Sequence, residues 1–226
     1  MKLTVKSKKA KTREAYSLIL DKPEGFTFYP GQYLDIELPI KNRDKRGRVR
    51  AYTIASSPTE DFLMITTKIG ISDFKKHLQH IKAGDSVAVT HPAGTFTLDE
   101  DEGAVMLAGG IGITPFRSMI KYLLDQKLTT PITLIYSNSD DNFLFKDELD
   151  KWQTDLPNLS LHYVNTKNDG RINKDKLQQI LNHGSLIKDP IFYLAGSWSF
   201  VDDMEGILLD LGVYEVNIRY DRFDGY

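Results

Sequence analysis

LAGGIGITPFRSMIKYLL, residues 107–124, joins an apolar, strand-like run to an amphipathic helical pattern. Between the two, three glycines open a turn, at positions 109, 110 and 112. Thr114 is expected to cap the helix, and Pro115 is expected to take its first position. Glycines let the backbone approach a ligand, and a helix N-terminus offers free N–H groups to an anion. The turn therefore predicts a pyrophosphate site in an α/β domain. A plain strand-to-helix connection has the same pattern, and Pro115 stands where the third glycine of G-x-G-x-x-G belongs.

The chain beyond about residue 100 alternates short apolar runs with helical segments. Helices are expected at about 112–125, 143–154, 174–182 and 198–211. Strands that alternate with helices form parallel βαβ units, whose right-handed crossovers cover both faces of the sheet. We therefore predict a C-terminal α/β parallel-sheet domain of the nucleotide-binding type at residues 101–226.

The first hundred residues have a different period. Six short runs of alternating polar and apolar residues lie at about 2–10, 13–21, 32–40, 50–57, 62–70 and 85–94. This spacing predicts a six-stranded antiparallel β-barrel at residues 1–100. The segment SDFKKHLQHI, residues 72–81, is the one helix expected there, because Ser72 can cap it and apolar residues recur on one face.

The composition is typical of a globular protein and excludes several classes of function. With 226 residues, 41% hydrophobic and 27% charged, the chain can form one large domain or two modest ones. A formal net charge of −2 gives no general attraction for nucleic acid. The absence of cysteine excludes disulfides, cysteine-ligated clusters and thiol catalysis, and five scattered histidines predict no metal site. The chain shows neither a signal peptide nor a run of about 20 apolar residues, so we expect a cytoplasmic protein without a membrane span.

A second informative stretch is RAYTIASSP, residues 50–58. In a strand, Arg50 and Tyr52 point to the same face. A guanidinium matches the geometry of a phosphate, and a phenol ring can stack on another flat ring. Taken alone, the pair is also consistent with ordinary cross-strand packing. The stretch is therefore a candidate site for a ligand that carries both an anion and a flat ring.

Seven motifs occur together in the order and approximate spacing of one known family. They are YPGQ, RAYTIASSP, KIGIS, HPAGTF, GGIGITPFRSMI, YLAG and RFDGY. On these motifs the chain resembles the ferredoxin–NADP reductase family of flavoenzymes over nearly its whole length. The resemblance implies an antiparallel FAD-binding barrel followed by an NAD(P)-binding domain, in agreement with the two periods of the sequence.

In that family an R-x-Y-[ST] strand holds the flavin. The resemblance implies that Arg50 faces the FAD pyrophosphate, that Tyr52 packs against the isoalloxazine, and that Thr53 lies near N5 as a catalytic residue. The turn KIGIS is similar to the family's G-x-x-S turn in shortened form. The cofactor-binding residues implied there are Lys68, Gly70, Ile71 and Ser72. The last of these is equally suited to capping the helix that follows.

The resemblance also assigns residues to the nicotinamide nucleotide. Gly110 and Gly112 match positions beneath the NAD(P) pyrophosphate. Thr114 matches a catalytic position close to the nicotinamide. Tyr226 resembles the terminal aromatic residue that covers the flavin where nicotinamide must dock, which makes it the third catalytic candidate.

The chain departs from the family at two places. Ala195 stands where many relatives have cysteine, and only Asp221 and Asp224 are available where relatives have a glutamate. Hydride transfer depends on the alignment of two rings more than on acid–base chemistry. We therefore expect activity to survive with an altered position of the nicotinamide.

The loops of the α/β domain carry opposing signals for the coenzyme. Ser139 stands where many NADPH-using relatives have arginine, and the carboxylates of Asp140 and Asp141 favour the free ribose hydroxyl of NADH. Lys167 and Arg171, in contrast, fall near where NADP-specific relatives place basic residues, so both are cofactor-binding candidates. NADH and NADPH both stay open, with a slight preference for NADPH because of its frequency in the family.

The resemblance implies an FAD-dependent NAD(P)H oxidoreductase that exchanges electrons with a one-electron carrier. Because the chain has no cysteine for a cluster of its own, the acceptor is expected to be a separate ferredoxin, flavodoxin or haem protein, or a small molecule. The basic segment KNRDKRGR, residues 41–48, either steers an acidic carrier or is a solvated loop. Two alternatives stay open: a reductase that uses free flavin as a substrate, and a non-catalytic flavin-binding module that responds to nucleotides.

Overall fold

The structure is a computed structural model that describes residues 1–40, 47–183 and 187–223. The chain groups into two compact units. The first contains Met1–Leu98 together with Arg117–Tyr122, and the second contains Asp99–Phe116 and the described residues from Leu123 onward. The domain ranges 1–100 and 101–226 stay predictions.

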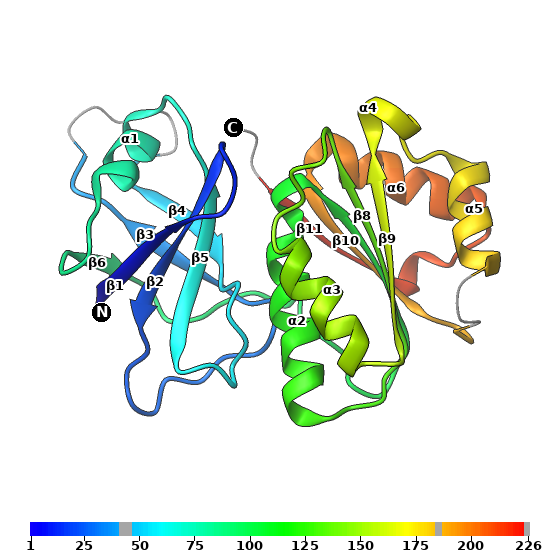
Figure 1. Cartoon of the computed structure of the whole chain (residues 1–226), viewed down its shortest axis with the longest axis horizontal. Coiled ribbons are helices and arrows are strands. Elements are labelled where there is room, and N and C mark those ends of the chain that lie inside the picture. The colour runs from blue at the N-terminus through cyan, green and yellow to red at the C-terminus, as the bar shows by residue number, and fades with distance from the viewer. Residues whose placement is uncertain (41–46, 184–186, 224–226) are drawn as a thin grey trace. The chain divides into compact units, whose positions relative to one another are not determined.

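The first unit is a six-stranded antiparallel sheet that curls into a nearly closed barrel (Figure 1). Its strands are β1 (Lys2–Ala10), β2 (Ala15–Asp21), β3 (Tyr33–Glu37), β4 (Val49–Thr53), β5 (Phe62–Lys68) and β6 (Ser86–Val89). They lie in the order β4-β3-β6-β1-β2-β5. The two end strands are linked just after β4, where the N–H of Ala55 donates to the carbonyl of Met64 in β5 (2.7 Å). The predicted six-stranded antiparallel architecture is confirmed.

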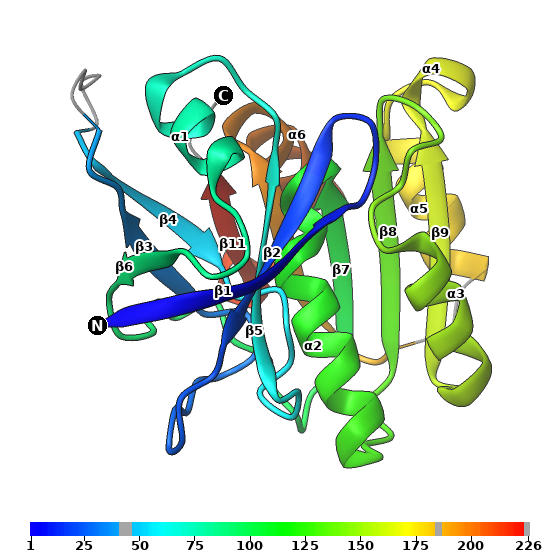
Figure 2. The same ribbon diagram turned by 60° about the vertical axis from the view of Figure 1, so that its left-hand side comes forward.

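Aliphatic and aromatic side chains from all six strands form the core of this unit. The alternation that predicts a strand is clearest in β1, where Leu3 and Val5 are buried and their neighbours are exposed. The helix α1 (Asp73–His80) lies at one end of the barrel and buries Phe74 and Leu78 (Figure 2). Ser72 caps α1 as expected, because its hydroxyl accepts from the backbone N–H of Lys75 (3.3 Å).

Polar contacts hold the chain that follows β4. The backbone N–H of Ser57 donates to the Glu60 carboxylate (2.7 Å). Arg117, which belongs to the same compact unit, donates from both terminal nitrogens to the Glu60 carboxylate (2.9 and 3.2 Å). Its Nη1 also donates to the carbonyl of Ala55 (2.8 Å). The end of the RAYTIASSP stretch is therefore held by side chains as well as by the sheet ladder.

The second unit is a five-stranded parallel sheet in the order β11-β10-β7-β8-β9. The strands are β7 (Ala104–Gly109), β8 (Ile132–Asn138), β9 (Leu159–Asn165), β10 (Ile191–Ser197) and β11 (Ile218–Phe223). The helical segments are η1 (Gly110–Gly112), α2 (Ile113–Gln126), α3 (Lys146–Asp155), α4 (Thr166–Asp169), α5 (Lys174–His183), α6 (Trp198–Asp210) and η2 (Glu215–Asn217). The four helices expected from the sequence are confirmed, and α4 is a short one that the sequence did not indicate.

The crossovers of this sheet run over opposite faces. Helices α2 and α3 cover one face, and α5 and α6 cover the other (Figures 1 and 2). The strand β7 pairs with β8 on one side and with β10 on the other, so the direction of the crossovers reverses between β7 and β10. In open parallel sheets, ligands bind outside the carboxyl ends of the strands at such a reversal.

Candidate functional site

Arg50 and Tyr52 share the face of β4 that looks into the barrel. In the ladder they lie opposite Ile36 and Leu34, which are fully buried. Tyr52 is only 9% exposed and stacks on Phe74 of α1, with ring centroids 6.2 Å apart and planes inclined by 24°. The guanidinium carbon of Arg50 lies 5.0 Å from the centre of the Phe74 ring. The two residues are thus brought together at the N-terminal turn of α1, where the sequence resemblance expects a pyrophosphate.

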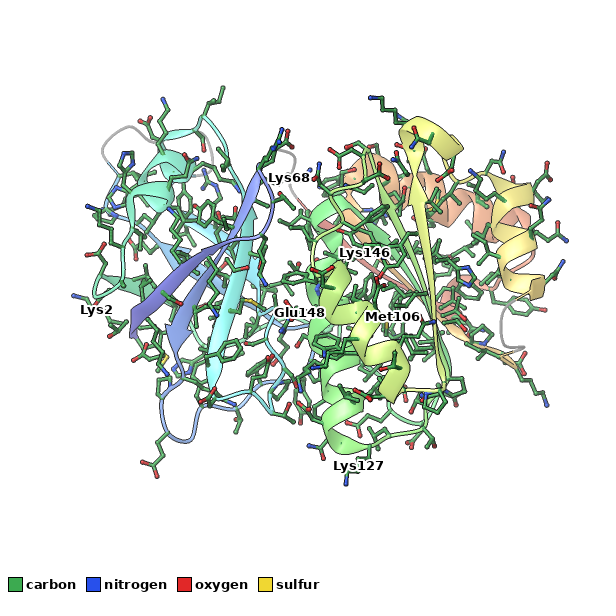
Figure 3. All side chains as sticks on the ribbon, in the orientation of Figure 1. Lys2, Lys68, Met106, Lys127, Lys146 and Glu148 are labelled. Carbon is green, nitrogen blue, oxygen red and sulfur yellow. The ribbon has the colours of Figure 1, made fainter. Side chains whose placement is uncertain are left out.

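The turn between β5 and α1 carries the other predicted flavin-binding residues. Lys68 is the last residue of β5 (Figure 3), and Ile71 is 90% exposed. The carbonyl of Gly70 accepts from the side-chain amide of Gln79 (2.8 Å), which fixes the turn against α1. The capping role of Ser72 is confirmed, whereas its role toward a ligand stays a prediction. The turn therefore leaves an exposed apolar side chain and a helix N-terminus together at one end of the barrel.

A buried hydroxyl that the sequence did not single out belongs to the same core. Tyr16 in β2 is buried, and among the described residues its phenol oxygen has no hydrogen-bond partner. Burial, with a smaller effect of the neighbouring Tyr52 phenol, raises the pKa of Tyr16, so its hydroxyl stays protonated. An unpaired buried hydroxyl costs about 1–3 kcal/mol, which a bound acceptor can offset. With Arg50 and the N-terminus of α1, this unit fits a flavin that carries a pyrophosphate.

The glycine turn of the second unit packs directly on β10. A Cβ atom added to Gly112 would lie 2.0 Å from the carbonyl oxygen of Ala195, so only glycine fits there. Gly110 has a φ of 55°, in the left-handed region that favours glycine. The ring of Phe200 lies over two further glycines, because a Cβ at Gly109 or Gly196 would come within 2.6 or 2.9 Å of it. Phe200 was missed by sequence reasoning; its only signal was an apolar residue in the first turn after YLAG.

Thr114 does not cap α2, which corrects the expectation. The helix begins at Ile113, with Gly112 at the N-cap position and no side-chain cap. The hydroxyl of Thr114, which is 2% exposed, instead donates to the carbonyl of Ile111 (3.0 Å). The reason is that η1 already curls the chain, so the helical path starts before the threonine. A role for Thr114 beside nicotinamide stays a prediction.

Ala195 lies near the carboxyl end of β10, next to the reversal of the crossovers. In register it pairs with Ala108 of β7 on one side and with Asp221 of β11 on the other. Burial raises the pKa of the Asp221 carboxyl to about 6. A carboxyl with this pKa is a candidate proton acceptor near neutral pH, in the region where relatives have a glutamate.

Asp221 is held in place by its neighbour on β11. The guanidinium of Arg222 lies 3.8 Å from the centre of the Tyr220 ring. It also forms ion pairs with Asp202 (3.0 Å) and Glu205 (2.6 Å) of α6. Since β11 is an edge strand, these contacts tie it to α6 and fix the position of Asp221.

The Asp221→Asn variant is expected to change how stability depends on pH. The pKa of this carboxyl is higher in the folded protein, at about 6, than its ordinary value of 3.8. The folded state therefore binds the proton more tightly, and stability falls as pH rises from about 4 to about 6. The free energy of unfolding of the variant should not decrease over this pH range, so the variant should be more stable than the wild type at pH 7. Chemical denaturation between pH 4 and pH 8 would measure the difference. The control is Asp210→Asn, at the exposed end of α6. Parallel curves for the wild type and Asp221→Asn would contradict the assignment.

The carboxyl ends of β8 and β9 form a network of amides and carboxylates. Asn138 and Asn165 pair in register there. The side-chain amide of Asn138 donates to the Asp140 carboxylate (3.0 Å), and that of Asn165 donates to Asp141 (2.7 Å). The carboxylate of Asp169 accepts from the backbone N–H of Asn165 (2.9 Å). Three carboxylates are thus held at this corner of the sheet.

Of the two predicted basic residues, Lys167 lies near this network and Arg171 does not. The backbone N–H of Lys167 donates to the side chain of Asn165 (3.0 Å), and the lysine itself is exposed. Arg171 lies beyond α4, with its guanidinium 3.8 Å from the Asp203 carboxylate of α6. Lys167 is therefore close to the carboxylates, while Arg171 faces another helix. Tyr226, Asp224 and residues 41–46 of the basic segment lie outside the described residues.

The comparisons with known proteins match both units. The family model of the oxidoreductase FAD-binding domain matches residues 1–98, and that of the oxidoreductase NAD-binding domain matches residues 106–205. Flavohemoprotein A from Dictyostelium discoideum is 31% identical over 211 residues, which cover 87% of this chain and 53% of that protein. Flavohemoprotein B from the same organism is 29% identical, over 92% of this chain and 55% of that protein. The chain thus spans about half the length of these curated relatives.

Solved structures show the same fold. A ferredoxin NADP+ reductase from Neisseria gonorrhoeae with bound FAD and NADP has a TM-score of 0.82 at 20% identity, covering 98% of both chains. The FAD/NAD-binding domain of a nitric oxide dioxygenase from Vibrio cholerae has a TM-score of 0.77 at 22% identity, also covering 98% of both.

These matches define the class of protein as an oxidoreductase with an FAD-binding and an NAD-binding domain. The chain belongs to the ferredoxin–NADP reductase family, and its domains are those of a flavin-dependent NAD(P)H reductase. The resemblance seen in the sequence is confirmed, and with it the cofactors FAD and NAD(P)H. Among the helices in the described part of the chain, none has the length and apolar character needed to cross a bilayer.

Proposed function

We propose that this chain takes electrons from NADH and delivers them singly to a haem protein. The observation that carries the proposal is that each unit matches a nucleotide-binding domain model and has a candidate nucleotide site of its own. One has an arginine and a tyrosine at the N-terminus of α1, and the other has a glycine turn packed on β10. When bound, FAD supplies the chemistry that converts a two-electron donor into single electrons. The haem acceptor is supported by the relatives, which are flavohemoproteins of about twice this length.

The residues of the chain have distinct roles in this proposal. Arg50 binds the FAD pyrophosphate, and Tyr52 stacks on the Phe74 ring against which the guanidinium of Arg50 lies. Thr53 is the candidate polar group beside the reactive ring. In the second unit, Gly112 allows the turn to approach β10, and Asp221 holds or releases a proton near neutral pH.

The test is an anaerobic reaction of the FAD-loaded protein, followed by flavin absorbance. One equivalent of NADH should bleach the flavin band, and two equivalents of a ferric globin added next should restore it, because each haem accepts one of the two electrons. A ferredoxin and a flavodoxin are tested in parallel. If NADH bleaches the flavin but ferredoxin or flavodoxin reoxidises it faster than the globin does, the proposal that the acceptor is a haem protein is contradicted. Turnover that needs added free flavin and stops when it is removed would instead support the free-flavin reductase.

NADH is proposed over NADPH because of the charges held at the ends of β8 and β9. The Asp141 carboxylate is anchored by Asn165, and Asp140 and Asp169 lie in the same network. A 2′-phosphate placed there would meet fixed negative charge, whereas a ribose hydroxyl could donate to it. This argument outweighs the frequency of NADPH in the family, since Lys167 is the one predicted base beside the network.

Replacing Asp141 with alanine is expected to move the ratio of kcat/KM for NADH over NADPH about tenfold toward NADPH. The reason is that one pair of like charges near a protein surface repels by roughly 1–4 kcal/mol. Steady-state rates with ferricyanide as acceptor would measure the ratio. The matched control is Asp155→Ala at the exposed end of α3, which should leave it unchanged. A ratio for Asp141→Ala equal to that of the control would refute the proposed coenzyme site.

A further inference from the structure

Lys75, in the first turn of α1, runs back across the flavin-binding turn. Its stem packs on Gly70, where an added Cβ atom would lie 3.0 Å from Cγ of the lysine. Its ammonium donates to the hydroxyl of Thr67 near the end of β5. The side chain is therefore directed toward β5 and is half-buried, unlike that of its exposed neighbour Lys76.

The ammonium of Lys75 also reaches the aromatic pair that holds Arg50. It lies 5.6 Å from the centre of the Tyr52 ring, and Tyr52 stacks on Phe74. The guanidinium of Arg50 lies 5.0 Å from the centre of the Phe74 ring. Two cationic groups from different elements thus contact one stacked pair of rings. Both groups therefore lie at the end of the barrel that carries the N-terminus of α1.

The N-terminus of α1 adds a third source of positive potential at this place. The N–H of Lys75 donates to the Ser72 hydroxyl and that of Lys76 to the Ser72 carbonyl, whereas the geometry of a helix gives the first two N–H groups of α1 no acceptor within the helix. A pyrophosphate carries two charges that neighbouring cations can share. Arginine suits it with a planar fork, and lysine suits it with a compact point charge.

We propose that Lys75 is a further FAD-binding residue, which supplies the second positive charge of the pyrophosphate site beside Arg50. The inference rests on the proposed function in that it takes FAD as the ligand of this unit. The motif R-x-Y-T names only the arginine, so the lysine is a feature of this chain's own turn. Gly70 matters for the same reason, because a larger residue would displace the lysine stem.

The test compares FAD binding by the full chain and three variants. Lys75→Met keeps the stem that packs on Gly70 and removes the charge, Lys75→Arg keeps a charge, and Lys76→Met removes an exposed charge one residue away. FAD dissociation constants are measured by flavin fluorescence at 50 mM and 300 mM salt. Melting temperatures of the apoproteins report on folding, and Lys75→Gln replaces Lys75→Met if that variant is unfolded.

Lys75→Met should raise the dissociation constant of FAD about tenfold at low salt, since a charge-assisted contact is lost. Lys75→Arg should recover most of this loss, and Lys76→Met should stay within about twofold of the wild type. The dependence of binding on salt should become weaker in Lys75→Met. Equal affinities of Lys75→Met and Lys76→Met, or a loss in Lys75→Arg as large as in Lys75→Met, would overturn the proposal. A wild type that binds no FAD would overturn the proposed function itself. This outcome differs from a failure of the Lys75 proposal, because neither the wild type nor any variant would then bind FAD.

Discussion

The Arg50→Met variant is expected to bind FAD roughly thirty- to a hundredfold more weakly than the wild type. Arg50 is the one predicted pyrophosphate ligand with a planar, bidentate head group, and hydrogen bonds to charged groups contribute about 1.5–3 kcal/mol each. The guanidinium is already placed against Phe74, so little conformational freedom has to be lost when the anion binds. Methionine keeps a straight side chain of similar bulk in this position. The loss should therefore reflect the charge and its hydrogen bonds.

Titration of the apoprotein with FAD, followed by fluorescence, measures this effect. The control is Arg48→Met, because Arg48 lies just before β4 and its guanidinium is 3.8 Å from Glu37 on a partly exposed surface. Near-ultraviolet circular dichroism of the apoproteins checks that the barrel is intact. Affinity of Arg50→Met within a few fold of Arg48→Met would remove Arg50 from the site and leave it as a packing residue.

The Gly112→Ala variant is expected to lose about 1–3 kcal/mol of folding free energy, as overpacked sites do. For a chain of this size the melting temperature should fall by roughly 3–10 °C. The added methyl group would lie 2.0 Å from the carbonyl oxygen of Ala195, so η1 and β10 must move apart. The φ of Gly112 is −61°, which alanine adopts easily, so backbone strain does not contribute. Since the turn is the candidate pyrophosphate site, NADH binding should weaken as well.

Gly206→Ala is the matched control for this steric effect. Gly206 lies in α6, and beyond the neighbouring helix backbone no atom comes within 4 Å of an added Cβ. Alanine in an exposed helix interior is more favourable than glycine by roughly 0.5–1 kcal/mol. Calorimetry should therefore show opposite shifts for the two glycines. If Gly112→Ala has the same melting temperature as the wild type, the turn packs less tightly on β10 than the distance of 2.0 Å indicates.

Most of the architecture could be predicted from local patterns. Buried and exposed residues alternate in barrel strands such as β1, and the later helices are flanked by apolar runs, because one-sided and two-sided burial impose different periods. The alternation is lost in β2 and β5, which are buried along most of their length. The site was predicted less completely. Ser72 was expected as a cap and is one, but Thr114 was expected as a cap and instead donates to Ile111. That error arose because the sequence does not reveal that η1 starts the helical path at Gly110, before the threonine.

Local sequence patterns were sufficient to predict the two nucleotide-binding folds and the family, since these patterns depend on residues that are close together in the chain. Which distant groups meet became visible only in the folded chain. Gly112 lies under Ala195, and Lys75 reaches Thr67 and the ring of Tyr52. Such contacts depend on strand register and on the path of each side chain. Neither is encoded in a local pattern, because a shift of one residue in register reverses the face of every side chain.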